Sequence, residues 1–419
     1  MPVFLCYYED RISLHLVISI VPTLSKERID IMCNQQSSGE YRTSSGKTVP
    51  VADAVGMVLA HDITEIRKDE FKGRAFKKGH VVRVEDVTHL KRLGKEHLFV
   101  LSLSPDEMHE DEAAHALAAA LMGKGVRVEG EPKEGKISIV ADHDGLLKIN
   151  RDALLSLNLL GDVMCATRHT NTLVRQGRVV AGTRAIPLAV KRAVVDEAVA
   201  LCETAKRDGN AVIEVKEMRK PNAGVVITGN EVYHGRIKDA FAPVISKKIE
   251  ALGGRIVGVY YAPDETAVIE QRLRELLDAG ADLLITTGGM SVDPDDVTRF
   301  AIRNIGARDV VYGSPVLPGA MFLAGYVNKA RSGEVGVKSE EHPKPEIRDS
   351  EHRTQNSELI PILGIPACGM YHSITILDLL LPRILIGEKI GRKELAELGH
   401  GGLCLHCKEC RYPVCPFGK

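Results

Sequence analysis

A glycine turn followed by a cluster of carboxylates is the stretch of this sequence best suited to chemistry. Residues 282–298 read DLLITTGGMSVDPDDVT, in which an apolar run leads into a glycine turn (TTGG, residues 286–289) and then into Asp293, Asp295 and Asp296. Glycines let backbone amides approach an anion closely, whereas carboxylates repel an anion unless a metal ion lies between them. The combination predicts a site for a phosphorylated ligand held with Mg²⁺. A plainer alternative is that Asp295 or Asp296 caps the helix that follows.

A second set of reactive side chains lies near the end of the chain, at Cys404, Cys407, Cys410 and Cys415. Four thiolates at this loop-forming spacing satisfy either tetrahedral Zn²⁺ or an iron–sulfur cluster. The spacing approaches that of a ferredoxin motif, with one residue too many before the fourth cysteine. Residues 393–419 are therefore predicted to be a metal-binding cysteine tail; four unrelated free thiols are the alternative.

Composition excludes several classes of protein. The 419 residues are enough for two or three domains, and 44% hydrophobic with 26% charged residues is ordinary for a globular protein. A net charge of −1, with 4% aromatic residues and no tryptophan, disfavours a nucleic-acid partner. The apolar run at residues 12–21 is too short to span a membrane. Nine cysteines with one dense tetrad indicate a reducing compartment, so we expect a cytoplasmic protein without a membrane partner.

The elements that position the glycine turn alternate between strand and helix from residue 224 onward. This alternation predicts a parallel sheet that binds its ligand at the carboxyl ends of the strands. The expected strands cover residues 225–228, 256–261, 283–287, 308–311, 320–327 and 359–365. The expected helices cover residues 239–252, 265–279, a stretch ending near 304, and 370–386.

The predicted domain organisation follows from changes in pattern along the chain. Residues 221–392 form the strand and helix domain, in which residues 328–357 have almost no large apolar side chains and are predicted to be a disordered insertion. Ahead of it we expect smaller α+β parts. These are a disordered extension at 1–47, a small α+β region at 48–101 with a helix over 51–60 and another over 84–93, and a middle α+β domain at 102–220.

Four motifs of the larger domain carry a resemblance to a known family. They are ITGNEVYHGRIKD at residues 227–239, APDE at 262–265, the glycine turn with its carboxylates, and PVLPGAMF at 315–322. With them, residues 224–390 resemble the molybdopterin-binding domain shared by molybdopterin molybdenumtransferases, molybdopterin adenylyltransferases and competence-damage-inducible proteins. The resemblance implies an α/β fold, a three-layer α/β/α sandwich with a mainly parallel sheet, that binds molybdopterin or adenylylated molybdopterin at the strand ends.

The resemblance also implies roles for individual residues. Asp296, Glu231 and Asp264 match acidic positions of the family, which implies catalytic roles for all three and Mg²⁺ coordination by Asp296 and Asp264. The implied ligand contacts lie within the motifs and in one further loop: Thr228, Gly229, Thr287, Gly288, Gly289, Ser291, Thr298, Pro318, Gly319 and Pro366.

Two departures from the family pattern bear on function. The usual lysine after Pro318-Gly319 is replaced by Ala320, and the usual Leu-Pro-Gly-Asn-Pro loop is replaced by IPACG at residues 365–369. A cationic contact and a rigid loop are therefore missing. Cys368 in that loop offers a thiolate to molybdenum or sulfur, or it is simply a small buried hydrophobe.

The resemblance implies an enzyme of molybdenum cofactor biosynthesis, most like a molybdopterin molybdenumtransferase. Such a transferase inserts molybdate into adenylylated molybdopterin with Mg²⁺-assisted release of AMP. Two alternatives stay open: a non-catalytic carrier or sensor of the cofactor, favoured by the altered loop, and a nucleotide pyrophosphatase like the competence proteins. The expected partners are the pterin, molybdate, other cofactor-assembly proteins or a molybdoenzyme, and further copies of the chain in a homo-oligomer.

Overall fold

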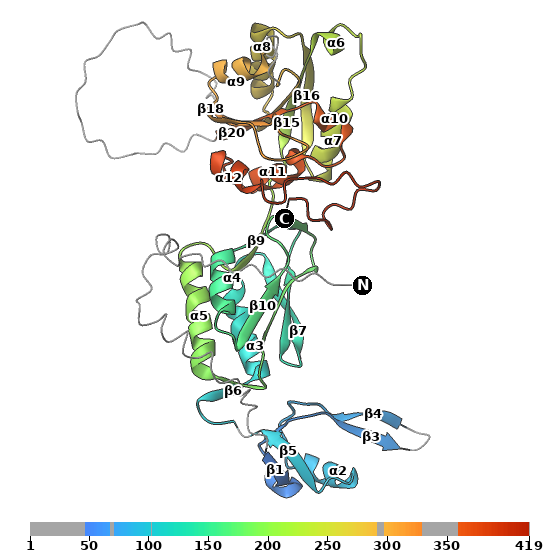
Figure 1. Cartoon of the computed structure of the whole chain (residues 1–419), viewed down its shortest axis with the longest axis vertical. Helices are drawn as coiled ribbons and strands as arrows, with labels where there is room; N and C mark the ends of the chain where they lie inside the picture. Colours follow the sequence, from blue (N-terminus) through green and yellow to red (C-terminus); the bar gives the residue numbers. More distant parts are fainter. Residues whose placement is uncertain (1–46, 68–70, 102, 291–296, 329–358, 419) are drawn as a thin grey trace, which may run out of the picture.

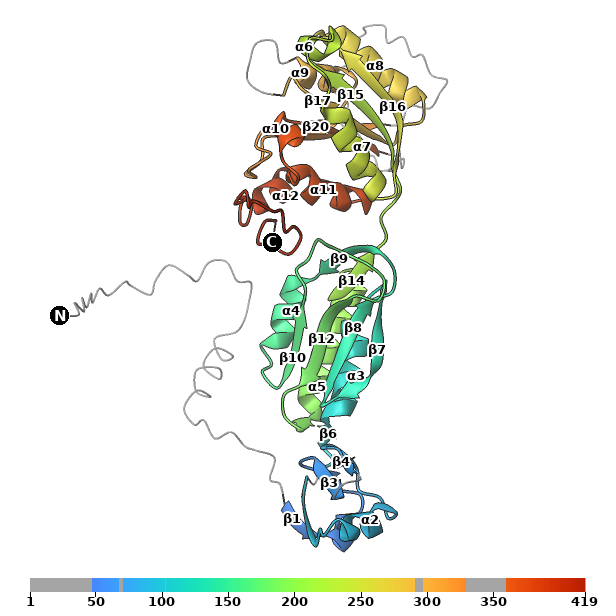
Figure 2. The same ribbon diagram turned by 90° about the vertical axis from the view of Figure 1, so that its right-hand side faces the viewer.

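Three folded parts follow one another along the long axis of the molecule (Figures 1 and 2). The structure, a computed structural model, describes residues 47–67, 71–101, 103–290, 297–328 and 359–418. The predicted extension and the predicted insertion lie almost wholly outside these residues. Within the described ranges, every helix is too short or too polar to cross a membrane.

The amino-terminal part, beginning at residue 47, is a small three-stranded sheet with a hairpin beside it. Its sheet has the order β1-β5-β2, and β3 pairs with β4. The predicted helix over residues 51–60 is wrong. A single 3-10 turn ends at Ala54, Gly56 takes a left-handed conformation (φ 83°), and Val58 and Leu59 pair with β5 instead. The elements are β1 (Lys47–Pro50), η1 (Val51–Ala54), β2 (Val58–Leu59), β3 (Ile63–Arg67), β4 (Phe71–Phe76), α2 (Asp86–Arg92) and β5 (His97–Leu101).

The middle part packs α3 and α5 against a four-stranded antiparallel sheet, β10-β12-β8-β7. Buried alanines on α3, among them Ala113, Ala114 and Ala118, let the neighbouring elements approach closely. A second sheet, β11-β9-β14, lies toward the carboxyl-terminal part. The elements are β6 (Glu107–His109), α3 (Glu110–Leu121), β7 (Val126–Lys133), β8 (Lys136–Ala141), β9 (Gly145–Ile149), α4 (Arg151–Asn158), β10 (Val163–Thr167), β11 (Thr172–Val174), β12 (Val179–Ala185), β13 (Ala189–Lys191), α5 (Arg192–Arg207) and β14 (Ile213–Lys216).

The carboxyl-terminal part is built on a six-stranded sheet of order β16-β15-β17-β20-β19-β18. The first four strands are parallel to one another, and β19 pairs antiparallel with both β20 and β18, which confirms the predicted mainly parallel α/β sheet. The elements are β15 (Asn222–Thr228), α6 (Asn230–Tyr233), α7 (Phe241–Ala251), β16 (Arg255–Ala262), α8 (Thr266–Asp278), β17 (Leu283–Thr287), α9 (Thr298–Asn304), β18 (Arg308–Tyr312), β19 (Leu323–Asn328), β20 (Leu359–Ile365), α10 (Cys368–Tyr371), α11 (Ile376–Leu385) and α12 (Arg392–Glu397).

Helices cover both faces of this sheet, which confirms the predicted three layers. Successive side chains of a strand point to opposite faces, so one strand contributes to two cores. In β17, Leu283 and Ile285 pack with α7 and α11, whereas Leu284 packs with α8 and α9 on the other face. All three side chains are fully buried, as a parallel strand covered on both faces requires.

One predicted helix of the carboxyl-terminal part differs from the structure. The expected helix over residues 370–386 is divided in two, because Thr375 and Asp378 form a capping box that begins a new helix, α11. Helix α9 begins directly after Val297, and the capping alternative falls on Asp295 and Asp296. Both aspartates lie outside the described residues.

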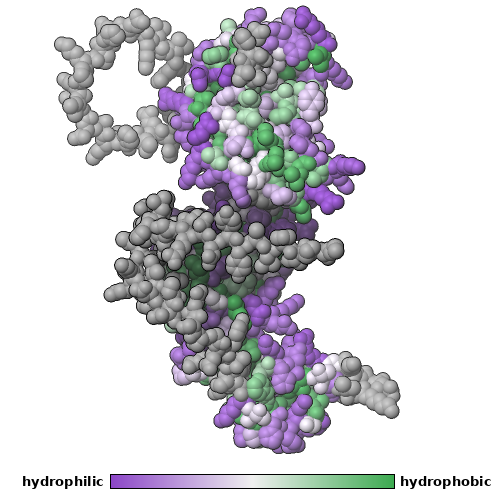
Figure 3. Space-filling model, viewed as in Figure 1, coloured by the Kyte–Doolittle hydropathy of each residue, from purple (hydrophilic) through white to green (hydrophobic). Residues whose placement is uncertain are grey.

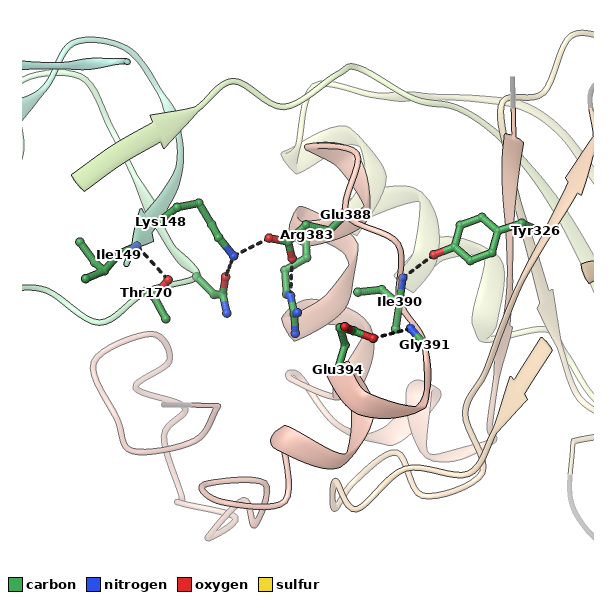
Figure 4. Close-up of polar contacts among 10 residues, drawn as sticks. Lys148, Ile149, Thr170, Tyr326, Arg383, Glu388, Ile390, Gly391 and Glu394 are labelled. Atoms are coloured by element: carbon green, nitrogen blue, oxygen red, sulfur yellow. Dashed lines mark hydrogen bonds and ion pairs between the residues drawn. The ribbon is translucent and has the colours of Figure 1, made fainter. Parts of the chain in front are cut away.

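A partly buried ion-pair cluster joins the middle part to the carboxyl-terminal part (Figure 4). Glu388 pairs with Lys148 of β9 and accepts a hydrogen bond from Arg383 Nε of α11 at 2.7 Å. Lys148 also donates to Asn171 Oδ1 at 2.7 Å. Burial raises the pKa of Glu388, but the hydrogen bonds from Arg383 and Lys148 outweigh it and hold the pKa below its ordinary value. The carboxylate is therefore charged in the folded protein.

Replacing Glu388 with glutamine tests this cluster. Because the folded-state pKa is depressed, the contribution to stability is complete above the ordinary glutamate pKa of about 4.3 and is lost as the pH falls through the folded value. We expect Glu388→Gln to lower the free energy of unfolding at pH 7 by about 1–3 kcal/mol, the usual worth of hydrogen bonds to a charged group. Urea unfolding from pH 7 to pH 3 measures it, and the deficit should shrink below pH 4.5. Glu397→Gln, at a 60% exposed side chain, is the control; an equal loss there would contradict the assignment.

Candidate functional site

A cluster of three buried threonines joins the ends of β15 and β17 to the start of α9. Thr228 Oγ1 donates to the carbonyl oxygen of Thr287 at 2.8 Å and lies 3.0 Å from Thr298 Oγ1. Each of the three residues is 3% exposed or less. Since parallel strands end at the same edge of a sheet, these bonds hold the two strand ends and the helix start together at the edge where open α/β sheets commonly bind ligands.

Gly288 and Gly289 follow directly and both have positive φ, at 79° and 54°. A Cβ on Gly288 would overlap the carbonyl oxygen of Thr228, and one on Gly289 would overlap Thr298 Oγ1. Glycine is therefore required at both positions for conformation and for space. The backbone of the glycine turn lies directly against the threonine cluster.

Thr287 leaves one polar atom in this packing unsatisfied. Its Oγ1 is buried and has no hydrogen-bond partner among the residues that the structure describes. Such an atom costs about 1–3 kcal/mol when it stays unpaired, so most buried hydroxyls bond to protein, water or a ligand. Thr287 Oγ1 is thus a candidate contact for a ligand atom or water at the strand end.

The acidic residues predicted from the sequence are only partly brought together. Asn230 N–H donates to Asp264 Oδ2 at 3.0 Å, and Asp264 N–H donates to Asn230 Oδ1 at 3.3 Å, so the turns after β15 and β16 are bonded to each other. The exposed Glu231 folds its carboxylate back beside Gly229. Glu231 and Asp264 therefore flank one turn, whereas Asp296 and Ser291 lie outside the described residues.

A metal site is not formed by these side chains. Nowhere in the described part of the chain do three or more His, Cys, Asp or Glu residues group as they would around one metal ion. Asp264 is engaged by a backbone amide, and its predicted Mg²⁺ partner Asp296 is not described. The Mg²⁺ prediction is therefore not supported by the residues in place, and the same holds for the metal predicted at the cysteine tail.

Arg299, which the sequence reasoning missed, places a cation at the same edge. It follows Thr298, and its guanidinium carbon lies 4.6 Å from the ring centre of Tyr312. Tyr312 in turn donates to the carbonyl oxygen of Met290 at 2.6 Å, and its hydroxyl lies 3.1 Å from Met321 Sδ, next to Ala320. Arg299 Nε is buried without a hydrogen-bond partner among the described residues. The feature of the sequence that could have indicated this residue is its position directly after the carboxylate motif.

Comparison with known proteins assigns this domain to a family. Residues 224–381 match the family model described as "Probable molybdopterin binding domain". This part of the chain is a molybdopterin-binding domain of that family. A second family model, a domain of unknown function, matches residues 48–102. The cysteine tail lies beyond both matches.

Relatives and solved structures are similar to parts of the chain. A "CinA-like protein" of Mycobacterium avium (strain 104) is 36% identical over 94 residues, 22% of each chain, and one of Mycobacterium tuberculosis (strain ATCC 25177 / H37Ra) is 36% identical over 89 residues, 21% of each. The chain thus spans about a fifth of the length of these curated relatives. The tungsten cofactor synthesizing protein MoaB from Pyrococcus furiosus is 17% identical, with 40% of this chain and 96% of that chain covered and a TM-score of 0.27. The molybdopterin biosynthesis enzyme MoaB from Thermus thermophilus is 21% identical, with 40% and 98% covered and a TM-score of 0.28.

Three other predicted contact residues are packed inside the molybdopterin-binding domain. Pro318 and Gly319 are buried against the start of α11, where the carbonyl oxygen of Pro318 accepts from Ile376 N–H at 3.3 Å. Gly319 (φ 136°) leaves no room for a Cβ beside Ile376. Pro366 is buried, and its carbonyl oxygen accepts from Gly369 N–H at 2.9 Å. In the described structure these residues shape two loops of the domain.

Cys368 behaves as a small apolar residue. It opens the short helix α10, it is half-buried, and burial raises the pKa of its thiol. A raised pKa keeps the thiol protonated near neutral pH, and only the thiolate is a good nucleophile or metal ligand. The hydrophobe interpretation of Cys368 is therefore favoured over the thiolate one.

A pair of glycine substitutions tests the close packing at the glycine turn. Gly288→Ala adds an unfavourable φ and an overlap with the Thr228 carbonyl, whereas Gly280→Ala, at φ 87° with open space around it, adds only the φ cost. We expect about 1 kcal/mol of destabilisation for Gly280→Ala and at least about 2 kcal/mol more for Gly288→Ala. Chemical unfolding of both variants measures the difference. Equal losses would show that Thr228 and Gly288 are not in contact.

Proposed function

We propose that the molybdopterin-binding domain binds molybdopterin or adenylylated molybdopterin at the carboxyl ends of β15 and β17 and acts in molybdenum cofactor biosynthesis. The observation that carries the proposal is the glycine turn packed against the threonine cluster. Gly288 and Gly289 admit no side chain, so the backbone amides of this turn are open to close approach by a phosphate. The buried Oγ1 of Thr287 supplies a polar contact at the same strand end.

Arg299 is the proposed counter-charge for the phosphate. A guanidinium at this edge can form charge-assisted hydrogen bonds to phosphate oxygens, and the Tyr312 ring holds it in place. The hydroxyl of Tyr312 also contacts Met321, which follows Ala320, where the family's lysine is absent. Arg299 would thereby replace the missing cationic contact.

The proposed reaction is insertion of molybdate into adenylylated molybdopterin with release of AMP, as in a molybdopterin molybdenumtransferase. Mg²⁺, when bound, would neutralise charge at the phosphoanhydride, and Asp296 with Asp264 are the proposed holders. Glu231, exposed beside Gly229, is free to reach a ligand or its attacking water. The proposed partners are the pterin, molybdate and other cofactor-assembly proteins, with the chain acting as a homo-oligomer in the cytoplasm.

The carrier function is the second candidate, and a specific observation favours it. The loop at residues 366–369 is folded into α10 around a protonated Cys368, so it offers neither a rigid Asn-Pro turn nor a thiolate. A carrier would bind the pterin and leave the phosphoanhydride intact. A nucleotide pyrophosphatase is a third candidate, supported by the 94-residue similarity to CinA-like proteins.

One assay separates these functions. Purified protein is incubated with adenylylated molybdopterin, Mg²⁺ and molybdate, and AMP is measured together with pterin binding. AMP release that requires the pterin adenylate is expected for the transferase, and Asp296→Ala should reduce it by about 100-fold or more, as loss of one catalytic electrostatic group does. Tight pterin binding without AMP would instead support the carrier. AMP from simple dinucleotides would support the pyrophosphatase.

Two arginines on α9 provide a matched test of phosphate binding. Arg299→Gln removes the stacked guanidinium, whereas Arg303→Gln removes an exposed one four residues later on the same helix. We expect Arg299→Gln to weaken binding of molybdopterin about tenfold or more, which corresponds to about 1.4 kcal/mol, and Arg303→Gln to leave it unchanged. Titration calorimetry or fluorescence measures the affinity. Equal effects of the two variants would remove Arg299 from the site.

A further inference from the structure

Residues 401–418, which we define as the tail loop, are held by backbone hydrogen bonds near both of their ends. Its first residues pair with the loop at 315–319: Leu317 N–H donates to Gly402 O and Cys404 N–H donates to Leu317 O, both at 2.8 Å. Gly418 N–H donates to Gly401 O at 2.9 Å, so the loop closes on itself. Apart from one isolated bridge, at Leu403, the tail loop contains no helix or strand.

Few large side chains of the tail loop lie in or against a hydrophobic core. Phe417 is 3% exposed and belongs to the core under α11, and Tyr412 packs against the same core, which raises the pKa of its hydroxyl to about 12. The other large apolar side chains are exposed: Leu403 62%, Leu405 69% and Val414 87%. Figure 3 shows hydrophobic residues gathered on the side of the domain where Figure 1 draws the tail. The centre of the loop therefore has almost no core of its own.

All four cysteines of the tail loop line a single pocket of about 400 Å³. Cys404 and Cys415 are half-buried at its base, where they pack against the core, and Cys407 and Cys410 are exposed at its rim. His372 and His406 also line the pocket, with their ring centres 4.8 Å apart and their ring planes tilted by 43°. The fold thus brings to one place the four residues whose spacing predicted a metal site.

We propose that Cys404, Cys407, Cys410 and Cys415 form a tetrathiolate metal site, for Zn²⁺ or an iron–sulfur cluster, that closes the tail loop. The thiols as described are not grouped in coordination geometry, so binding must draw the two rim cysteines toward the two at the base. The rim residues lie outside helices and strands, so that movement breaks no regular secondary structure. Metal binding coupled to local folding is the usual behaviour of small cysteine sites, and it releases the thiol protons to solvent.

The metal site would act as the missing core of the tail loop. A loop of this length with few buried side chains needs another source of order, and four thiolate bonds provide one. Because the loop is paired to Leu317 and borders His372, the metal would also hold the two loops that follow β18 and β20. The inference rests on the cysteines and their pocket alone and does not depend on which reaction the domain performs.

The first test is the metal content of the full chain purified without oxygen. We expect about one zinc per chain, or iron accompanied by an equal amount of acid-labile sulfide, and the two results distinguish the two kinds of centre. Alkylation read by mass spectrometry should spare the four tail cysteines until a chelator is added. Less than about one metal per ten chains, after reconstitution with either metal, together with four freely alkylated thiols, would overturn the proposal. Disulfides among the four would overturn it as well.

Single substitutions identify the ligands. Cys407→Ser and Cys410→Ser change exposed side chains, so the fold should survive, and we expect metal affinity to fall at least about tenfold in each. Cys368→Ser, outside the pocket, and His406→Asn, which keeps a residue tolerant of the positive φ of 49°, should retain the metal. Retention of metal by both serine variants, or its loss in the His406→Asn variant, would contradict the four-cysteine assignment.

Discussion

The close contact between the glycine turn and Thr228 is the constraint on which the rest of the candidate site depends. Gly288 lies so near the Thr228 carbonyl that no side chain fits, and the Thr228 hydroxyl bonds both to Thr287 O and to Thr298 Oγ1. One side chain therefore sets the distance between two parallel strands and the position of the next helix. This brings Asp264, Arg299 and the glycine backbone to one edge of the sheet.

The charges at this edge are arranged in an unusual way for the family that the sequence resembles. The lysine expected after Gly319 is replaced by Ala320, and Arg299, a cation from a different element, lies over the ring of Tyr312. An arginine held over an aromatic ring loses less freedom on binding a phosphate than a lysine on a flexible stem. The proposed phosphate contact would thus be made by an oriented, planar group. The acidic residues Glu231 and Asp264 flank the opposite turn, after β15.

The parts of the chain are joined by polar contacts, and each part has its own core. The middle and carboxyl-terminal parts have separate hydrophobic clusters, and the pair of Lys148 with Glu388, supported by Arg383, spans them. A link of this kind is specific in geometry, so these charged groups help to set the relative position of the two parts. The tail loop is different, because its closing residue Phe417 belongs to the carboxyl-terminal core itself.

Local sequence was a reliable guide where packing and propensity agreed, and it failed where a single turn overrode the pattern. The helix expected over residues 51–60 is not formed, because Gly56 adopts a left-handed conformation and Val58 pairs with β5. The helix expected over 370–386 is divided at Thr375, whose side chain caps a new helix. The strands of the parallel sheet could be predicted from the sequence because they are continuous apolar runs. Such runs are typical of strands that are buried on both faces.

The sequence by itself determined the fold class of the carboxyl-terminal part, the place of the glycine turn at a strand end, and the clustering of four cysteines, because these features depend on residue types at short spacing. The tertiary structure decided which distant residues meet. It alone shows that Thr228 bonds to Thr287 and Thr298, that Arg299 stacks on Tyr312, and that the tail loop pairs with Leu317. Those contacts join residues from 13 to 86 positions apart, as the numbering shows, and no local pattern encodes such pairings.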